Sequence, residues 1–327
     1  MLTLGSTPDN PVPPGGALKA VRTDDGVELR VAHWRPTTRL VKGTVCLLQG
    51  RAEFIEKYYE TIEDLRGRGF SVVAFDWRGQ GESQRQVADP HKGHVARFDD
   101  YRRDLAAVED AVLRPLMPLP HIALAHSMSG AVAFTGAHEG WLPFSRIVTV
   151  APMLALRMVR WPAGASALAR FLHRLGLGRR YIPFGAPTSI ATKPFARNRL
   201  STDPLRYARN AEAARAVGAG AVGDPTIAWL AGAFRTMARL RDRRVAAAIA
   251  IPALIVGAGA DPVCETRATE RFARLVRGAH ILVLPGARHE ILSEADAIRD
   301  DFWAAFDAFV PGTVVAAEEP AGASTGA

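Results

Sequence analysis

The sequence predicts an α/β protein in which a mostly parallel sheet carries helices on both faces and an inserted helical cap. Two observations predict this class. Six short, continuously apolar runs alternate with helical patterns, as in chains built from strand-helix units. Between residues 152 and 245 the alternation stops and the pattern is helical throughout. The composition, 48% hydrophobic and 23% charged over 327 residues, fits one large packed domain with an insertion and excludes disordered, collagen-like and coiled-coil classes.

The first expected element is an antiparallel hairpin, indicated by the turn Asp25-Gly26 and the alternating apolar pattern of residues 27–34. The apolar runs that follow lack polar alternation, which is typical of strands covered on both faces. They predict strands at residues 44–48, 71–75, 121–125, 147–151, 253–256 and 280–284. Helices are expected between them, for example over residues 98–114, where Tyr101, Leu105 and Val108 recur at helical spacing.

The interruption of this alternation defines the expected domains. Residues 17–151 and 246–312 form the core, and residues 152–245 form the cap, which lies over the carboxyl ends of the strands because it is inserted between two of them. Residues 1–16 and 313–327 have too little apolar surface to offset their ordering entropy, so we expect both to be flexible tails.

Two apolar stripes predict helices inside the cap: Leu168, Phe171, Leu172 and Leu175 form the first, and Ile227, Leu230, Phe234 and Met237 the second. Asp224 is placed to cap the second helix, with Pro225 at its first position.

The positive charge of the chain is concentrated in the cap. Residues 152–244 hold 17 basic and four acidic residues, so their net charge is +13, against −5 for the rest of the chain. This imbalance predicts a peripheral contact between the cap and an anionic membrane surface, although codon usage alone would also produce an arginine-rich composition. No recognised nucleic-acid-binding module accompanies the charge, so we expect no nucleic-acid partner.

The remaining composition points to a cytoplasmic protein that contacts membranes only peripherally. The longest apolar stretch, residues 245–260, is interrupted by Pro252 and is too short to cross a bilayer. The first residues contain Asp9 and several prolines, unlike a signal peptide. Two cysteines, Cys46 and Cys264, cannot form a disulfide framework or a zinc site alone, so we expect them to be buried small residues and expect no metal.

A candidate nucleophile follows the predicted strand at residues 121–125, in the stretch Ile122-Ala-Leu-Ala-His-Ser-Met-Ser-Gly130. A serine raised on a tight strand-to-helix turn needs small residues two positions to either side, and Ser127 has Ala125 and Ser129 there. The usual pattern has glycines at both positions, so two alternatives stay open: a serine that merely caps the helix, or Ser129 as the nucleophile.

Two further strand ends supply partners for Ser127. Asp261 follows the strand at 253–256, and His289 follows the strand at 280–284. Chain order is therefore Ser, Asp, His, unlike the orders found in the chymotrypsin and subtilisin proteases. In this arrangement His289 would accept the Ser127 proton as general base, and Asp261 would hold the imidazole in the correct tautomer.

With these motifs the sequence resembles the serine hydrolases of the α/β-hydrolase fold, in the branch of monoacylglycerol lipases and bacterial lysophospholipases. The resemblance covers about residues 20 to 310. It is carried by Gln49-Gly-Arg-Ala-Glu-Phe54, Asp76-Trp-Arg-Gly-Gln-Gly-Glu-Ser83, the Ser127 motif, Asp261 and His289. Gln49 stands where the family usually has histidine.

The resemblance implies several roles. The backbone N–H groups of Arg51 and Met128 would form the oxyanion hole, and Asp76 and Arg78 would form a structural ion pair. His126 would order the turn around the nucleophile, while Glu53 receives no role. No cofactor is implied. Leu230 and Phe234, on the second stripe of the cap, are the candidate substrate-binding residues.

The predicted function is a serine carboxylic ester hydrolase that acts through an acyl-Ser127 intermediate on a small-molecule ester, with a lysophospholipid or monoacylglycerol as the expected substrate. One alternative is a small-ester or thioester hydrolase with the same chemistry. Another is a non-catalytic binding protein on the same fold, because Gln49, Ala125 and Ser129 each depart from the usual pattern.

Overall fold

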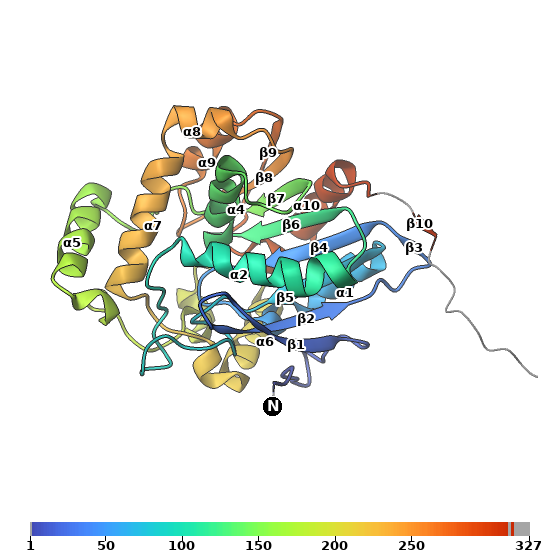
Figure 1. Ribbon diagram of the computed structural model, residues 1–327, viewed down its shortest axis with the longest axis horizontal. Coiled ribbons are helices and arrows are strands. Elements are labelled where there is room, and N and C mark those ends of the chain that lie inside the picture. The colour runs from blue at the N-terminus through green and yellow to red at the C-terminus, as the bar shows by residue number, and fades with distance from the viewer. Residues whose placement is uncertain (1, 313–314, 317–327) are drawn as a thin grey trace, which may run out of the picture.

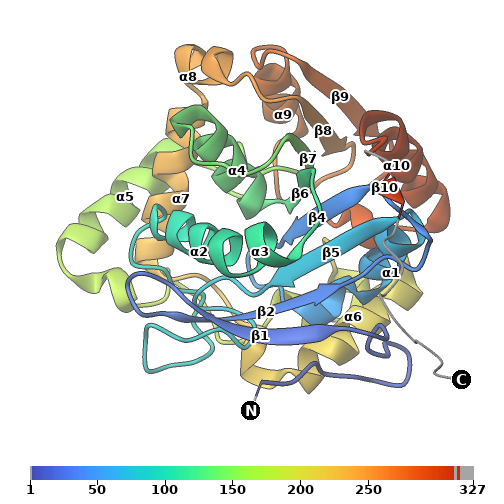
Figure 2. The same ribbon diagram turned by 45° about the vertical axis from the view of Figure 1, so that its right-hand side comes forward.

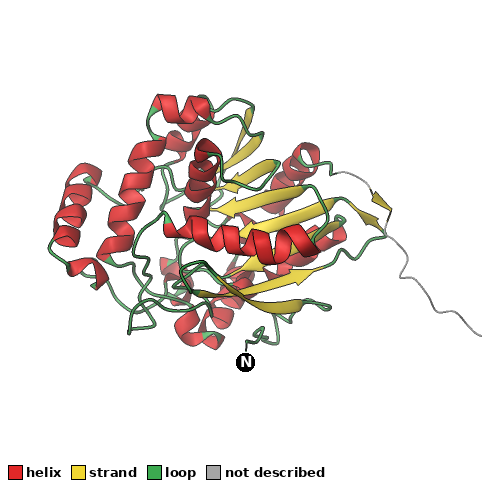
Figure 3. Cartoon of the chain, in the orientation of Figure 1, coloured by secondary structure: helices red, strands yellow, loops and turns green. Residues whose placement is uncertain are grey.

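The computed structural model describes residues 2–312 and 315–316. Its centre is a sheet of eight strands in the order β1-β2-β5-β4-β6-β7-β8-β9, which forms the middle layer between helices (Figure 3). The strands are β1 (Ala17–Arg22), β2 (Glu28–Trp34), β4 (Gly43–Leu48), β5 (Phe70–Phe75), β6 (His121–His126), β7 (Arg146–Val150), β8 (Ala253–Ala258) and β9 (Ala279–Leu284). The pairs β1–β2 and β2–β5 are antiparallel, and the other five pairs are parallel. The predicted α/β fold class is confirmed.

Helices cover both faces of this sheet (Figure 2). One face packs against α2 (Asp100–Val108), α4 (Met128–Glu139) and α9 (Thr266–Ala273), and the other against α1 (Tyr59–Gly67) and α10 (Asp296–Phe309). Within β4, Cys46 and Leu48 point to the first face while Val45 and Leu47 point to the second. Burial on both faces explains why the strands read as continuous apolar runs.

Shorter elements complete the core. The predicted helix at 98–114 is α2 followed by a π-helical turn, η2 (Glu109–Leu113), and by α3 (Arg114–Leu116). The 3₁₀ turn η1 (Ile55–Tyr58) leads into α1, and η7 (Ile291–Ser293) precedes α10. A small second sheet pairs β3 (Leu40–Val41) with β10 (Val315–Ala316) in antiparallel register.

Four helices lie between β7 and β8; α5 and α6 lie toward the end of the sheet to which the parallel strands point, whereas α8 leads into the start of β8 (Figure 1). They are α5 (Pro162–Arg174), α6 (Pro204–Ala216), α7 (Ile227–Leu240) and α8 (Arg243–Ala248), with short 3₁₀ turns η3 (Leu177–Arg179), η4 (Ile190–Thr192), η5 (Phe195–Arg197) and η6 (Gly218–Gly220). We refer to residues 152–245 as the cap. Among the described residues, none of the helices is long and apolar enough to cross a membrane.

The cap differs from expectation at the start of α7. Thr226, not Asp224, is the N-cap residue, and its Oγ1 accepts a hydrogen bond from Trp229 N. The Asp224 carboxylate instead accepts from Ala186 N at 2.9 Å, so it holds a neighbouring loop. Gly93 and Tyr181 form β-bridges with residues 225 and 226 and keep this segment extended. The helix α7 therefore begins only at Ile227.

The two expected tails also differ from the prediction. Residues 2–16 pack on the core: Gly5 N donates to Glu56 Oε1, Asn10 Nδ2 donates to Glu56 O, and Pro13 O accepts from Trp34 Nε1. These partners lie far along the chain, so the local composition of the segment did not reveal them. In the C-terminal segment, residues 315–316 form β10, and the rest of residues 313–327 lies outside the described residues.

Candidate active site

Ser127 occupies the sharp turn between β6 and α4. Its backbone adopts φ 52° and ψ −112°, a conformation that side chains rarely take and that a nucleophile turn imposes. The turn is held by hydrogen bonds from Ser127 N to Val150 O and from Met153 N to Ser127 O. Gly130 is needed close by, because a Cβ there would lie 2.7 Å from the Pro152 Cβ. The segment after β7 therefore approaches α4 so closely that a side chain at position 130 would clash with it.

The structure brings Ser127, Asp261 and His289 together at the carboxyl ends of three strands. His289 Nε2 lies 2.9 Å from Ser127 Oγ, and His289 Nδ1 lies 2.9 Å from Asp261 Oδ2. The other Asp261 oxygen accepts from Val263 N at 2.7 Å and Cys264 N at 3.0 Å. All three side chains are buried, with Ser127 at 9% exposure the most accessible.

The hydrogen bonds assign the protons of this group. Burial by itself would raise the pKa of Asp261, but the adjacent imidazole and the two backbone N–H groups outweigh it and lower that pKa. An ionised carboxylate only accepts hydrogen bonds, so Nδ1 of His289 carries the proton. Nε2 then has a free lone pair 2.9 Å from the Ser127 hydroxyl, which is the geometry a general base requires.

Ser129, the rival nucleophile, lies in a different environment. It is fully buried, and its hydroxyl donates to Gln49 O, which also accepts from Trp77 Nε1 at 2.9 Å. The Ser129 hydroxyl already donates its proton to a carbonyl, and among the described contacts no imidazole is its partner. It therefore holds the loop after β4 in place.

The loop after β4, residues 49–53, is held by side chains from two directions. Gln80 Oε1 accepts from Ala52 N at 3.0 Å, and Gln80 Nε2 donates to Gly50 O at 2.8 Å. Gly50 N donates to Glu53 Oε2. Among the described residues, the N–H of Arg51 and that of Met128, the first residue of α4, have no partner. Arg51 and Met128 follow the neighbouring parallel strands β4 and β6, and two unpaired donors in such loops are what an oxyanion hole requires.

Behind the nucleophile lies a buried charged network that the sequence did not predict. His126 places Nδ1 2.9 Å from Glu53 Oε2 and Nε2 3.2 Å from His289 O. Both partners can only accept, so His126 donates from both nitrogens and is an imidazolium. Burial opposes this charge, but the Glu53 carboxylate outweighs it and raises the His126 pKa. Glu53 thus joins the oxyanion loop, through Gly50 N, to the backbone of His289.

Lys57 completes this network. Its ammonium lies 2.6 Å from Glu53 Oε1 and 2.5 Å from Glu290 Oε1, and Tyr58 donates to Glu53 at 2.6 Å. Burial would raise the pKa of Glu53, but His126 and Lys57 outweigh it and lower that pKa well below its usual value. The signal available in the sequence was Glu53 itself, an acidic residue in the motif of residues 49–54 to which no partner was assigned.

The expected ion pair between Asp76 and Arg78 is wrong. Asp76 pairs with Arg30 at 2.7 Å, and Arg78 pairs with Asp104 at 2.7 Å. Both residues lie in the loop after β5, and each finds a partner that is distant in sequence and brought close only by the fold. Asp76 also accepts from Ile55 N at 3.0 Å, which anchors the segment after the oxyanion loop.

The remaining predicted residues are placed as follows. Leu230 is half-buried and Phe234 is buried, both within the apolar cluster that joins α7 to the core, and their contact with substrate stays a prediction. Cys46 and Cys264 are buried free thiols. Within the described ranges, Asp261, Cys264 and His289 form one group whose potential metal-ligating atoms lie within 4.8 Å. Burial raises the pKa of the Cys264 thiol well above its usual value, so it is a poor ligand.

Comparison with known proteins identifies the family. The family model described as Hydrolase_4, serine aminopeptidase S33, matches residues 40–296. The chain belongs to this family. Its resemblance to α/β-hydrolases of the lysophospholipase and monoacylglycerol lipase branch is thereby confirmed, and it is a serine hydrolase.

Individual relatives support the same placement. The chain is 36% identical over 272 residues to lysophospholipase L2 of Escherichia coli K12, covering 78% of this chain and 76% of that protein. It is 25% identical over 292 residues to mouse monoglyceride lipase, covering 84% and 87%. Among solved structures, a soluble variant of monoglyceride lipase from Saccharomyces cerevisiae has a TM-score of 0.70 at 17% identity, covering 90% and 96%, and shows the shared fold.

Proposed function

We propose that this protein hydrolyses the carboxylic ester of a monoacyl lipid, a lysophospholipid or a monoacylglycerol, through an acyl-Ser127 intermediate. The observation that carries the proposal is His289, whose two ring nitrogens lie 2.9 Å from Ser127 Oγ and from Asp261 Oδ2. The identity to lysophospholipase L2 and to monoglyceride lipase supports the substrate class.

The reaction follows from this geometry. His289 Nε2 takes the Ser127 proton while Oγ attacks the ester carbonyl, and the N–H groups of Arg51 and Met128 stabilise the oxyanion that forms. Protonated His289, stabilised by Asp261, then gives the proton to the departing glycerol oxygen. Water attacks the acyl enzyme in the second half of the reaction, with His289 again as base, and releases the fatty acid.

The test uses variants of Ser127 and its neighbours. Ser127→Ala and His289→Ala should each lower kcat for a monoacyl lipid by about 10⁶, and Asp261→Asn by about 10⁴, because these groups act as a unit. A fluorophosphonate probe should label the wild type and Ser129→Ala but not Ser127→Ala. Labelling that disappears in Ser129→Ala and persists in Ser127→Ala would overturn the assignment of the nucleophile.

A peripheral contact with an anionic membrane forms the second part of the proposal, and the supporting surface lies on α5. The first apolar stripe faces outward there: Phe171 is 58% exposed and Leu175 59%, and Trp161 beside the helix is 77% exposed. Arg160, Arg170 and Arg174 are exposed around them. Apolar side chains ringed by arginine are complementary to anionic lipid, with each basic residue near the surface contributing about 1 kcal/mol. We call these residues the α5 face.

A second group of cap arginines does not form such a surface. Arg235, Arg239 and Arg243 recur at four-residue steps in the sequence but do not line one helix, because α7 ends at Leu240 and α8 begins at Arg243. Arg239 is moreover paired with Glu139 of α4. Co-sedimentation with anionic vesicles should therefore fall with added salt, and equal binding to neutral and anionic vesicles would contradict the contact.

A further inference from the structure

The Arg51 side chain is a partly buried cation without an ion pair. It leaves the oxyanion loop and reaches the cap, where Nη1 donates to Gly223 O at 2.7 Å and the guanidinium lies 5.7 Å from the centre of the Trp229 ring. Within the described part of the chain, this is its one hydrogen bond, and no carboxylate pairs with it. Burial lowers the pKa of Arg51, and the more distant Asp224 offsets this only in part.

Other buried arginines of this protein are neutralised or fully bonded. Arg30 pairs with Glu56 and Asp76, and Arg78 pairs with Asp25 and Asp104. Arg85 has no carboxylate at hand, but its guanidinium donates to four backbone carbonyls, those of Ser83, Gly81, Ala219 and Pro90. Arg51 differs from both groups, because Nε and Nη2 have no partner among the described residues.

These unbonded nitrogens are open to a ligand. Some polar side-chain atoms of this protein have no hydrogen-bond partner and are also sealed from solvent. No atom of Arg51 belongs to this group. The guanidinium lies where two loops meet at the boundary of core and cap, since a Cβ on Gly93 would be 3.4 Å from Nη1 and Gly223 O is its acceptor. The same residue carries the backbone N–H that we place at the ester carbonyl. Arg51 therefore extends from the reacting centre toward the boundary with the cap.

We propose that the Arg51 guanidinium binds the phosphodiester of a lysophospholipid headgroup and so makes the enzyme prefer lysophospholipids to monoacylglycerols. The inference rests on the proposed function. In a 1-acyl lysophospholipid, the glycerol carbons separate the phosphate from the ester carbonyl by about the length of an arginine side chain. A planar guanidinium donates two parallel hydrogen bonds to phosphate oxygens, and such bonds are strong where water is displaced. The glycerol hydroxyl of a monoacylglycerol carries no charge and gains far less.

The experiment compares two substrates with the same short acyl chain, 1-octanoyl-lysophosphatidylcholine and 1-octanoylglycerol, both as monomers in solution so that membrane binding plays no part. Arg51→Met keeps the backbone N–H and a long, flexible side chain but removes the guanidinium. We expect the ratio of kcat/KM for the phospholipid to kcat/KM for the glycerol ester to fall by about 10- to 100-fold. Arg51→Lys, which keeps the charge but not the planar fork, should recover part of the ratio.

The ratio cancels any effect of the substitution on the ester step that both substrates share. Arg199→Met, which removes one exposed positive charge from the cap, is the matched control and should leave the ratio unchanged. Inhibition by two compounds distinguishes a site for the headgroup from a site for free phosphate. If Arg51 binds the headgroup, glycerophosphocholine should inhibit hydrolysis far better than sodium phosphate does.

Two outcomes overturn the proposal, and they can be told apart. If Arg51→Met hydrolyses both substrates with the wild-type ratio, Arg51 does not bind the headgroup and the proposed function stands. If the wild type hydrolyses neither substrate although the fluorophosphonate probe labels Ser127, the proposed substrate class fails as well. Circular dichroism of each variant checks that it is folded.

Discussion

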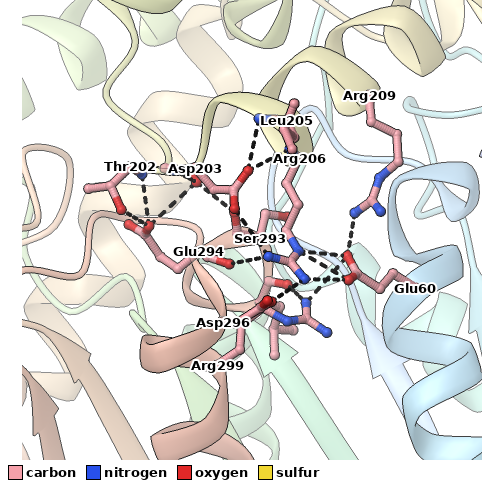
Figure 4. A network of polar contacts seen from close by, with 12 residues as sticks. Glu60, Thr202, Asp203, Leu205, Arg206, Arg209, Ser293, Glu294, Asp296 and Arg299 are labelled. Atoms are coloured by element: carbon pink, nitrogen blue, oxygen red, sulfur yellow. Dashed lines mark hydrogen bonds and ion pairs between the residues drawn. The ribbon is translucent and has the colours of Figure 1, made fainter. Parts of the chain in front are cut away.

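The two ends of the cap are attached to the molecule by different interactions. The α6 end is joined to the core by ion pairs: Arg206 lies 2.7 Å from Glu60 of α1 and 2.7 Å from Asp296 at the start of α10, and Arg209 also pairs with Glu60 (Figure 4). The α5 end packs on α7, at the outer edge of the molecule in Figure 1, and leaves its apolar stripe in solvent. The same inserted segment therefore contains a firmly anchored part and an open apolar surface.

Glu60 shows how strongly the α6 end is anchored. Burial would raise the pKa of this carboxyl, but hydrogen bonds from Arg206 and Arg209 outweigh it and lower the pKa to about 2. Glu294 adds a second connection, because it accepts from Thr202 N at 2.8 Å and from Arg288 N at 2.7 Å, next to His289. Anchoring α6 therefore also positions the loop that carries the proposed catalytic base.

The comparison shows that the basic residues behind the +13 net charge of the cap do not all lie on one exposed surface. Arg206 and Arg209 of α6 are neutralised by acidic residues of the core, whereas the arginines around α5 are exposed beside apolar side chains. Charge that is paired contributes to stability, and charge that is exposed beside apolar residues is available to a partner. Two experiments separate these roles, and a third tests the junction between core and cap.

The largest expected effect is on stability at the α6 end. Glu60→Gln removes the charge that faces Arg206, Arg209 and Arg299, and should lower the free energy of unfolding by about 2 kcal/mol. Glu63→Gln is the matched control on the same helix, because Glu63 is 45% exposed and pairs with Arg66 three residues away, within α1 itself. Urea unfolding of both variants measures the difference, and equal midpoints would mean that the network of Figure 4 does not anchor α6.

A smaller effect is expected on membrane binding at the α5 end. Phe171→Ser combined with Leu175→Ser should weaken binding to anionic vesicles by about 10-fold or more, because two apolar side chains no longer enter the lipid surface. Stability should hardly change, since both side chains are already exposed. Leu205→Ser provides the control at the α6 end, where Leu205 is 80% exposed. If Leu205→Ser weakens vesicle binding as much as the α5 variant does, the contact is not specific to the α5 face.

The smallest effect concerns His94, at the junction between core and cap, where Nδ1 lies 2.8 Å from Thr226 Oγ1 at the start of α7. Burial lowers the pKa of His94 to about 4, below the value of 6.5 in an unfolded chain. Between these values the unfolded chain binds a proton that the folded chain does not, so stability falls as pH falls.

His94→Gln should remove this sensitivity. Relative to the variant, the wild type should lose about 1 kcal/mol of stability between pH 7 and pH 5.5, as measured by urea unfolding at each pH. His91→Gln, three residues away, controls for the removal of an imidazole. Parallel pH profiles for the wild type and His94→Gln would show that the protonation of His94 is not linked to folding.

Much of the core could be predicted from the sequence. Each of the six apolar runs corresponds to a strand whose ends differ by no more than two residues, because burial on both faces demands an uninterrupted apolar run. Ser127, Asp261 and His289 could be proposed as a group since each lies in the loop or turn after a strand, and the ends of parallel strands converge at one edge of the sheet. The α7 cap residue, the partners of Asp76 and Arg78, and the buried network of Glu53 were not predicted.

Local sequence thus determined the order of the elements and the position of the polar residues at the strand ends, because apolar periodicity and small residues at a turn are properties of neighbouring positions. Tertiary structure alone decided which charges are paired and which face of a helix stays in solvent. The apolar stripe of α5 has the helical spacing of the α7 stripe, which packs in the core. It is exposed because no other element of the described chain covers it. Arg51 is similar, since an arginine becomes an unpaired, partly buried cation only when the surrounding fold offers it a carbonyl and an aromatic ring but no carboxylate.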